Sequence, residues 1–215
     1  MNKRVVITGM GVISPVGNSV NDFRDGIFSG KNGIDKITKF DTEGFRACLA
    51  AEVKDFDVSA YMDKNEARKL DKYTQYAIAS AMQAVSDSKI AESVSPERFG
   101  VYFGSGIGGF ETMITEHSKL LERGPQRVSP MFIPKMIANI AAGNIAIKFG
   151  AKGPCLSIVT ACATGSSCIG EAFRAIKGGY ADAIIAGGAE ASINPLGVAG
   201  FINCMALCEG TDKDR

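Results

Sequence analysis

Short apolar stretches that end in glycine alternate with longer stretches of helical periodicity, and this alternation is the strongest constraint on the fold. The stretch "RFGVYFGSGIGG" (98–109) predicts a strand that ends in a glycine turn. In "ADAIIAGGAEAS" (181–192) the centre is almost wholly apolar, which is typical of a central strand covered on both faces. Strands that alternate with helices indicate an α/β layered fold.

The other predicted elements continue the alternation. The sequence "NEARKLDKYTQYAIASAMQAVSDSKI" (65–90) has apolar residues at helical spacing and predicts one long helix. A buried strand is expected at 153–160, where β-branched residues follow Gly-Pro. The remaining expected elements are a strand at 3–9, a short helix at 21–29 capped by Ser19 or Asn21, strand-like pieces at 46–53, helices at 110–122, 134–150 and 163–179, and a new helical segment from 196.

Composition and charge narrow the class of protein. The 215 residues are 46% hydrophobic and 22% charged, which is enough apolar material for a sizeable core. The formal charge of +1, from 24 basic and 23 acidic residues, gives no reason to expect a nucleic-acid or membrane partner. The first apolar run is broken by Gly9, Gly11 and Pro15, too early for the apolar region of a signal peptide or a spanning helix. We therefore expect a soluble protein of the cytoplasm.

The six cysteines lack the spacing of a disulfide framework. With no export signal, free thiols in a reducing cytoplasm are the expectation. Cys204 and Cys208 form a C-x3-C pair, but no second pair exists and the only histidine, His117, is distant in sequence. We expect no metal site, because this pair supplies too few ligands for zinc.

The glycines of "GSGIGG" (Gly104, Gly106 and Gly109) match the G-x-G-x-x-G pattern of dinucleotide-binding folds between a predicted strand and a predicted helix. Such a fold then needs a second strand that ends in an acid to hold the ribose. Here a helix and "RGPQRVSP" follow instead. The pattern also suits tight turns and close backbone packing, and a nicotinamide-dependent dehydrogenase is not supported.

Two groups of ionisable residues fit an ordinary solvated surface, and for the second group a docking role is also open. His117 lies in the middle of a predicted helix among Glu116, Ser118 and Lys119, which is typical of an exposed histidine on a solvated face. A basic run at the start of the 65–90 helix is either a solvated face or a docking patch for an acidic carrier. The run includes Lys64, Arg68 and Lys69.

Cys162 lies between the predicted strand 153–160 and the predicted helix 163–179, among very small residues. A helix N-terminus favours the thiolate, which is the nucleophilic form. Its free N–H groups can also hold the negative charge that develops on oxygen when a thioester carbonyl is attacked. Small neighbours permit a sharp turn, as in the nucleophile elbow of hydrolases. The residues alone leave two interpretations open, a nucleophile and a buried structural cysteine.

The segment "TACATGSSCIGEA" (160–172) resembles the active-site cysteine motif of the β-ketoacyl-[acyl carrier protein] synthases, the condensing enzymes of fatty-acid synthesis. The resemblance runs along the whole chain in family order, through "RVVITGMGVISPVGN", "GSGIGG", "SPMFIP", "GAKGPCLSIVTACATG" and "AGGAEASINPLGVAGF". Within the family the likeness is to the elongating synthase II. The resemblance implies that Cys162 is the catalytic residue that accepts the acyl chain.

The resemblance also implies a fold and a reaction. Residues 1–215 would be the amino-terminal ketoacyl-synthase domain of a thiolase-like fold. That domain is a layered α/β/α half with a mixed, mostly parallel sheet, the first of two similar halves in a homodimer. The family transfers an acyl group to the cysteine, then decarboxylates malonyl-carrier protein and forms a carbon–carbon bond. It needs no metal or redox cofactor, since acyl carrier protein brings the acyl and malonyl thioesters on its phosphopantetheine arm.

Residue by residue, Ile107 and Phe201 match substrate-binding positions that line the acyl pocket, and Lys64, Arg68 and Lys69 resemble the carrier-docking patch. In the family two histidines and a lysine from the second half complete the site, and His117 matches neither histidine. The chain looks truncated in a surface loop. We therefore expect it to accept an acyl group but not to condense one alone. The alternative is a non-catalytic ketosynthase-like subunit, or a structural half that needs a partner chain.

Overall fold

The computed structural model describes residues 4–210 and divides them into two compact units. One, here called the sheet unit, comprises residues 4–11 and Asp57–Ala191. The other, here called the ribbon unit, comprises Val12–Phe56 and residues 192–210. That both belong to a single domain, as expected from the sequence, stays a prediction.

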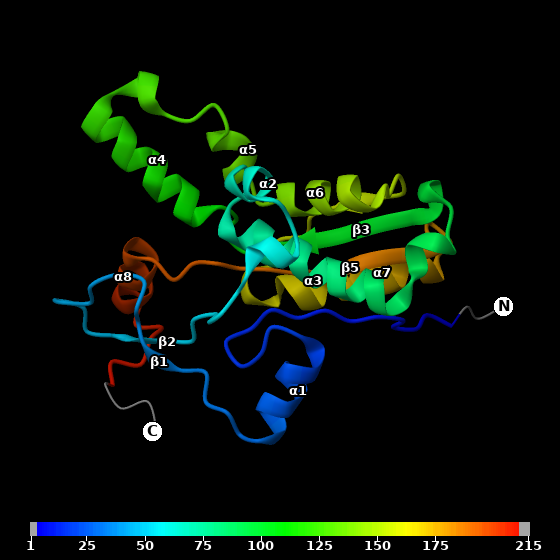
Figure 1. Ribbon diagram of the computed structural model, residues 1–215, viewed down its shortest axis with the longest axis horizontal. Coiled ribbons are helices and arrows are strands. Elements are labelled where there is room, and N and C mark those ends of the chain that lie inside the picture. Colours follow the sequence, from blue (N-terminus) through cyan, green and yellow to red (C-terminus); the bar gives the residue numbers. More distant parts are fainter. Residues whose placement is uncertain (1–3, 211–215) are drawn as a thin grey trace. The chain divides into compact units, whose positions relative to one another are not determined.

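A parallel three-stranded sheet forms the centre of the sheet unit (Figure 1). Its strands are β3 (Phe99–Gly104), β4 (Cys155–Leu156) and β5 (Ala183–Gly188), in the order β4-β3-β5. All six residues of β3 are buried. The strand predicted at 98–109 is therefore confirmed. The prediction that 181–192 is the central strand is wrong for the described residues, because β5 pairs with β3 on one side and ends the sheet.

Helices cover both faces of this sheet, as the layered α/β/α prediction requires. Because side chains alternate along a strand, Val101 and Phe103 of β3 pack in one core with α3 (Lys72–Ser88) and α6 (Ile140–Phe149). Tyr102 points the other way and packs against α7 (Thr164–Lys177), with Cys168, Ala172 and Ala175. In Figure 1, β3 and β5 accordingly lie between α6 and α7.

Two predicted helices are each split, the first at a local capping residue and the second where distant groups donate to its carbonyls. The 65–90 helix is wrong as one element: α2 (Lys64–Arg68) ends and α3 begins after Asp71, whose carboxylate caps it by accepting from Tyr73 N. The 134–150 helix is divided into α5 (Phe132–Met136) and α6. Between them the Tyr73 hydroxyl donates to Ile137 O at 2.7 Å and Gly109 N donates to Met136 O at 2.8 Å, so these carbonyls do not continue a helix.

Two predicted strands are also corrected. Residues 4–9 form no strand. This segment instead lies on α3, where Gly9 and Gly11 leave no room for a side chain against the backbone of Ala84 and Ser80. The buried strand predicted at 153–160 is wrong in extent and burial: it reduces to β4, a two-residue strand that pairs with β3, and both of its residues are exposed.

The helices at 110–122 and 163–179 are confirmed as α4 (Phe110–Arg123) and α7, whose C-cap is Gly178. The sheet unit also contains short 3-10 turns, η1 (Val58–Ala60), η2 (Ile90–Glu92), η3 (Pro96–Arg98), η4 (Pro125–Arg127) and η5 (Ala161–Ala163). On α4, His117 is exposed as expected, but its neighbour Glu116 is buried and accepts from Ser129 N at 2.7 Å. The solvated face predicted for this helix is therefore wrong at Glu116.

The ribbon unit contains α1 (Val20–Phe28), an antiparallel pair of β1 (Asp35–Lys36) and β2 (Leu49–Ala50), and α8 (Pro195–Asn203). Ser19 caps α1 by accepting from Asp22 N, which decides between the two predicted caps. The buried apolar core is small and comprises Ile37, Ala47, Val198 and Ile202. Among residues 4–210, no helix combines the length and apolarity needed to cross a membrane.

Candidate active site

Three loops leave the carboxyl ends of the three parallel strands and meet at one edge of the sheet. The loop after β4 leads to Cys162, the loop after β3 is Ser105–Gly109, and the segment after β5 carries Glu190. The carboxyl edge of a parallel sheet is where ligands bind in open α/β folds. The sheet topology therefore brings Cys162, Ile107 and Glu190 to the same edge.

Cys162 lies in η5, a tight turn between the strand and α7. Ala161 has a φ of +50°, in the left-handed region, which disfavours an L residue by about 1–2 kcal/mol. Ala163 N donates to Thr160 O at 3.1 Å and so closes the turn around the cysteine. The sharp turn predicted from the small residues is confirmed. Cys162 itself is exposed.

The helix that follows begins at Thr164, two residues after Cys162, and the described residues provide no side-chain cap for it. The N–H groups in the first turn of a helix lack intrahelical acceptors. They carry partial positive charge that favours a thiolate or an oxyanion beside them. The arrangement can therefore present a cysteine sulfur together with donors for a developing oxygen charge.

The other thiols in the sheet unit are less suited to nucleophilic chemistry. Cys155 is exposed as a residue, but partial burial of its thiol raises the pKa of that group, and full burial under β3 raises the pKa of Cys168. A raised pKa keeps a thiol in its weakly nucleophilic form at neutral pH. Only Cys162 combines exposure with a position at the start of a long helix.

Glu190 organises the glycine loop after β3, and the sequence analysis did not identify it. Its Oε2 accepts from Gly106 N at 2.9 Å and from Ile107 N at 3.3 Å. Its Oε1 accepts from the Ser105 hydroxyl at 3.1 Å, and Ser105 Oγ in turn accepts from Gly108 N at 2.9 Å. The only available sequence signal was an acid directly after the apolar strand, in "AGGAE".

This carboxylate has two consequences. It occupies the N–H groups that a phosphate would need, so the loop does not fit the dinucleotide site that the G-x-G-x-x-G pattern suggested. It also holds the loop beside the cysteine turn: a Cβ atom on Gly106 would lie 2.8 Å from Glu190 Oε2 and 3.5 Å from Ala161 O. Ile107 follows in the same loop and is 44% exposed.

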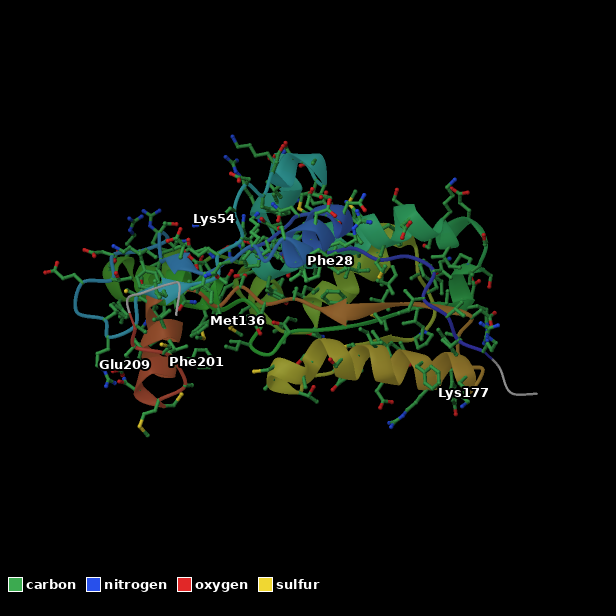
Figure 2. All side chains as sticks on the ribbon, turned by 90° about the horizontal axis from the view of Figure 1, so that it is seen from below. Phe28, Lys54, Met136, Lys177, Phe201 and Glu209 are labelled. Atoms are coloured by element: carbon green, nitrogen blue, oxygen red, sulfur yellow. The ribbon has the colours of Figure 1, made fainter. Side chains whose placement is uncertain are left out.

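The other predicted site residues belong to other elements. Lys64, Arg68 and Lys69 are all exposed on or directly after α2. The acid within this run, Glu66, is paired with Lys148 at 3.2 Å. Phe201 belongs to α8 in the ribbon unit and is 45% exposed (Figure 2).

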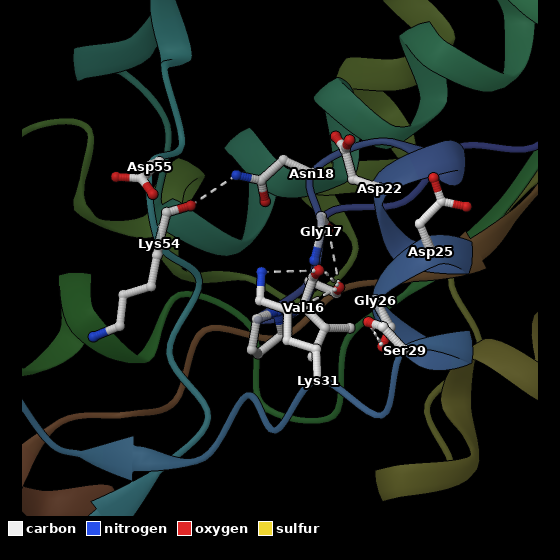
Figure 3. Close-up of a pocket in the computed structure, with 12 residues that line it drawn as sticks. Val16, Gly17, Asn18, Asp22, Asp25, Gly26, Ser29, Lys31, Lys54 and Asp55 are labelled. Atoms are coloured by element: carbon white, nitrogen blue, oxygen red, sulfur yellow. Dashed lines mark hydrogen bonds between the residues drawn. The ribbon is translucent and has the colours of Figure 1, made fainter.

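A separate pocket of about 680 Å³ lies within the ribbon unit (Figure 3). It is lined by the loop Ser14–Asn18, by residues of α1, and by Lys31, Lys54 and Asp55. Asn18 Nδ2 donates to Lys54 O at 2.7 Å across it. None of the predicted site residues lines this pocket.

The Cys204–Cys208 pair has a spacing that could supply two metal ligands. Within residues 4–210, no three His, Cys, Asp or Glu side chains gather in a way that could hold a metal ion. Both thiols are exposed, and Cys208 Sγ accepts from Gly210 N at 3.4 Å.

The layered α/β fold of the chain is that of the thiolase-like ketosynthases. Among solved structures, the ishigamide ketosynthase/chain length factor superposes with a TM-score of 0.87 and 30% identity, over 97% of this chain and 52% of that chain.

Sequence comparison then gives the family. The model of the β-ketoacyl synthase N-terminal domain matches residues 2–214, so the chain belongs to the β-ketoacyl synthase family. The 3-oxoacyl-[acyl-carrier-protein] synthase 2 of Staphylococcus aureus (strain COL) is 49% identical over 212 residues, which are 98% of this chain and 51% of the relative. The enzyme of the same name from Synechocystis sp. is 46% identical over 95% of this chain and 50% of the relative. The chain thus spans about half the length of these curated relatives.

Proposed function

We propose that this chain is the acyl-accepting half of a 3-oxoacyl-[acyl carrier protein] synthase that elongates fatty acids, with Cys162 as the catalytic nucleophile. The observation that carries the proposal is the exposed Cys162 in the turn before α7. The match of residues 2–214 to the N-terminal domain of the family supports it. So does the name shared by the relatives from Staphylococcus aureus and Synechocystis.

The proposed first step is a transfer between two thioesters. The Cys162 thiolate attacks the carbonyl carbon of an acyl chain on the phosphopantetheine arm of a carrier protein. A carbon–sulfur bond to Cys162 forms, the bond to the arm breaks, and the arm leaves as a thiol after taking up a proton. The N–H groups at the start of α7 are the donors that would hold the oxygen charge in between.

The second step forms the new carbon–carbon bond. Malonyl-carrier protein loses carbon dioxide, its enolate carbon attacks the acyl group on Cys162, and the cysteine leaves as thiolate. The enolate oxygen needs donors, a role that the family resemblance gives to histidines absent from residues 1–215. The single histidine here, His117, is exposed on α4. We therefore propose that residues 1–215 alone do not condense acyl groups.

The proposed partner is an acidic acyl carrier protein that docks at Lys64, Arg68 and Lys69. All three cations are exposed, and the acid among them is neutralised by Lys148. Charge complementarity of this kind mainly raises the association rate and weakens with salt. The double variant Arg68→Glu/Lys69→Glu in the complete synthase should raise KM for carrier-bound substrate and spare a free acyl thioester. Equal effects on both substrates would exclude the docking role.

The remaining properties of the complete enzyme are proposed from the family resemblance. Ile107 and Phe201 would line the acyl pocket, and the complete enzyme would be a homodimer in the cytoplasm that needs no metal or redox cofactor. The free state of all six cysteines fits a reducing compartment.

The nucleophile is tested by trapping the acyl-enzyme. The complete synthase is incubated with acyl-carrier protein, and the modified peptide is identified by mass spectrometry. Wild type and Cys204→Ala should carry the acyl group at Cys162, and Cys162→Ala should carry none. Cys204 is a matched control because it is also exposed. An acyl group on Cys204, or full acylation of Cys162→Ala, would refute the assignment.

A further inference from the structure

The first residue of α7, Thr164, reaches back across the cysteine turn. Its side chain is buried, with 4% exposed. Its Oγ1 accepts a hydrogen bond from Thr160 N at 3.0 Å, so the bond spans Cys162 from the helix side to the strand side. Its methyl group lies at the end of β3, where a Cβ atom on Gly104 would come within 2.6 Å of Cγ2. The hydroxyl group and the methyl group of Thr164 therefore both contact neighbouring parts of the chain.

The turn that this bond spans contains a residue in an unfavourable backbone conformation. Ala161 adopts a φ of +50° without being glycine, and such a conformation persists only where the surroundings impose it. Two other hydrogen bonds bracket the same turn: Ala163 N donates to Thr160 O at 3.1 Å, and the hydroxyls of Thr160 and Ser167 lie 2.8 Å apart. The hydroxyl pair is exposed, so water can replace it. The Thr164 hydroxyl is shielded, and its loss would leave Thr160 N without that acceptor.

The geometry points to Thr164 as a positioning residue whose buried hydroxyl holds Ala161 in the left-handed conformation and thereby fixes Cys162 at the N-terminus of α7. The inference rests on the proposed function, because it concerns how the nucleophile is presented. Thr164 does not touch the substrate in this account. It acts through the backbone of the turn, so its removal should slow reactions at Cys162 and leave substrate binding largely unchanged.

The experiment compares Thr164→Val with Thr164→Ser in the complete synthase. Valine keeps the volume and loses the acceptor, whereas serine keeps the acceptor and loses the methyl group. Thr74→Val is the matched control, because Thr74 is also a fully buried threonine but belongs to α3, on the opposite face of the sheet from α7. For each variant the measurements are the rate of Cys162 alkylation by iodoacetamide, resolved by peptide mapping, kcat and KM for acyl transfer, and Tm.

Thr164→Val should slow alkylation of Cys162 and lower kcat by about tenfold, with KM changed less than about twofold, since a small misplacement of a reacting group is costly. Thr164→Ser should stay within about threefold of wild type, and Thr74→Val should match wild type. If Thr164→Val reacts as fast as Thr74→Val, or if serine is as slow as valine, the inference is wrong.

A rescue experiment tests the mechanism and covers the case in which Thr164→Val does not fold. Glycine tolerates a positive φ, so Ala161→Gly/Thr164→Val should fold and recover most of the alkylation rate. A double variant that is unfolded, or as slow as Thr164→Val, would overturn the role assigned to the hydroxyl. Failure of the proposed function can be told apart from failure of this inference. If only the proposed function is wrong, the wild type gives no 3-oxoacyl product, but Thr164→Val still slows alkylation of Cys162.

Discussion

The sheet unit and the ribbon unit are stabilised by different means. In the sheet unit, an apolar core extends from β3 to α3 and α6, and it contains large side chains with no exposed surface, such as Tyr73 and Ile145. In the ribbon unit the four buried apolar residues include one alanine. Its most buried charged group, Glu52, is only 2% exposed. One unit relies on apolar burial, and the other relies more on a hydrogen-bonded carboxylate.

Glu52 shows how a charge can serve in place of a larger core. Its carboxylate accepts from the Thr38 hydroxyl at 2.6 Å, Thr38 N at 3.1 Å and Lys39 N at 3.2 Å, and it pairs with Lys54 Nζ at 2.9 Å. Burial by itself raises the pKa of Glu52, but the bonds from Thr38 and Lys54 outweigh burial and lower it from 4.5 to about 2. The two units should therefore respond differently to core truncation and to acid.

The largest effect is expected from Phe99→Ala in the sheet unit. Phe99 is 2% exposed at the start of β3, and removal of a buried phenylalanine ring costs about 3–5 kcal/mol of unfolding free energy. Urea denaturation measures the loss. The control Phe173→Ala removes a ring that is 44% exposed on α7 and should cost far less. Equal losses would mean that burial is not what distinguishes the β3 core.

The next effect is expected from Glu52→Gln in the ribbon unit, and it depends on pH. A pKa that falls from 4.5 to about 2 on folding corresponds to at most about 3 kcal/mol of stabilisation at neutral pH. Since the folded-state pKa is the lower one, this stabilisation is complete above pH 4.5 and is lost as the pH falls through about 2. Wild type and Glu52→Gln should accordingly differ at pH 7 and converge in acid.

Urea denaturation at pH 7, 4 and 3, followed by a probe placed in the ribbon unit, measures this convergence. Asp25→Asn is the control, because Asp25 pairs with Arg24 at 3.0 Å on the exposed surface of α1 in the same unit, where a pair contributes about 0–1 kcal/mol. A constant difference between wild type and Glu52→Gln across the pH range would contradict the role given to the ionised carboxylate.

A smaller effect, equal in both units, is expected when helix caps are removed. Ser19 caps α1 in the ribbon unit, and Asp63 caps α2 in the sheet unit by accepting from Asn65 N and Glu66 N. Alanine at either position should cost about 1 kcal/mol, because a cap is a local interaction. Chemical denaturation of the two variants checks this. If one substitution lowers the unfolding free energy several times more than the other, helix capping also differs between the two units.

The smallest effect is expected from Ala161→Gly beside the proposed nucleophile. Glycine relieves the left-handed strain of about 1–2 kcal/mol but adds freedom to the unfolded chain, so a net gain of about 0.5 kcal/mol is expected. Thermal denaturation should show a slightly raised Tm. A lowered Tm would indicate that Ala161 is not strained in the folded protein.

The sequence predicted those elements whose pattern is local. The strand β3 with its glycine end, the amphipathic α4 and the small-residue turn at Cys162 were all correctly predicted. The breaks after Arg68 and Met136 were missed, because they depend on Asp71 as a cap and on acceptor carbonyls used by Tyr73 and Gly109. Tyr73 and Gly109 are distant in sequence from the carbonyls to which they donate, and Asp71 lies within a sequence of good helical periodicity.

The candidate site shows the same limit. The turn at Cys162 was predicted because the small residues that permit it are neighbours in sequence, whereas the role of Cys162 as nucleophile came from the family resemblance and stays a proposal. Glu190 was missed because its importance comes from hydrogen bonds to Ser105, Gly106 and Ile107, more than eighty positions earlier. Only the parallel pairing of β3 with β5 brings that acid to the loop.

The glycines at the strand ends set limits on how such a chain could diversify. A methyl group on Gly104 would collide with Ile158 O, and one on Gly188 would lie 3.1 Å from Gly165 Cα. Either change would push on the segment that leads to Cys162 or on the first turn of α7. Ile107 stands in open surroundings by comparison, with 44% of its side chain exposed. We therefore expect sequence variation at this end of the sheet to concentrate at side chains such as Ile107, while the glycines at the strand ends stay unchanged.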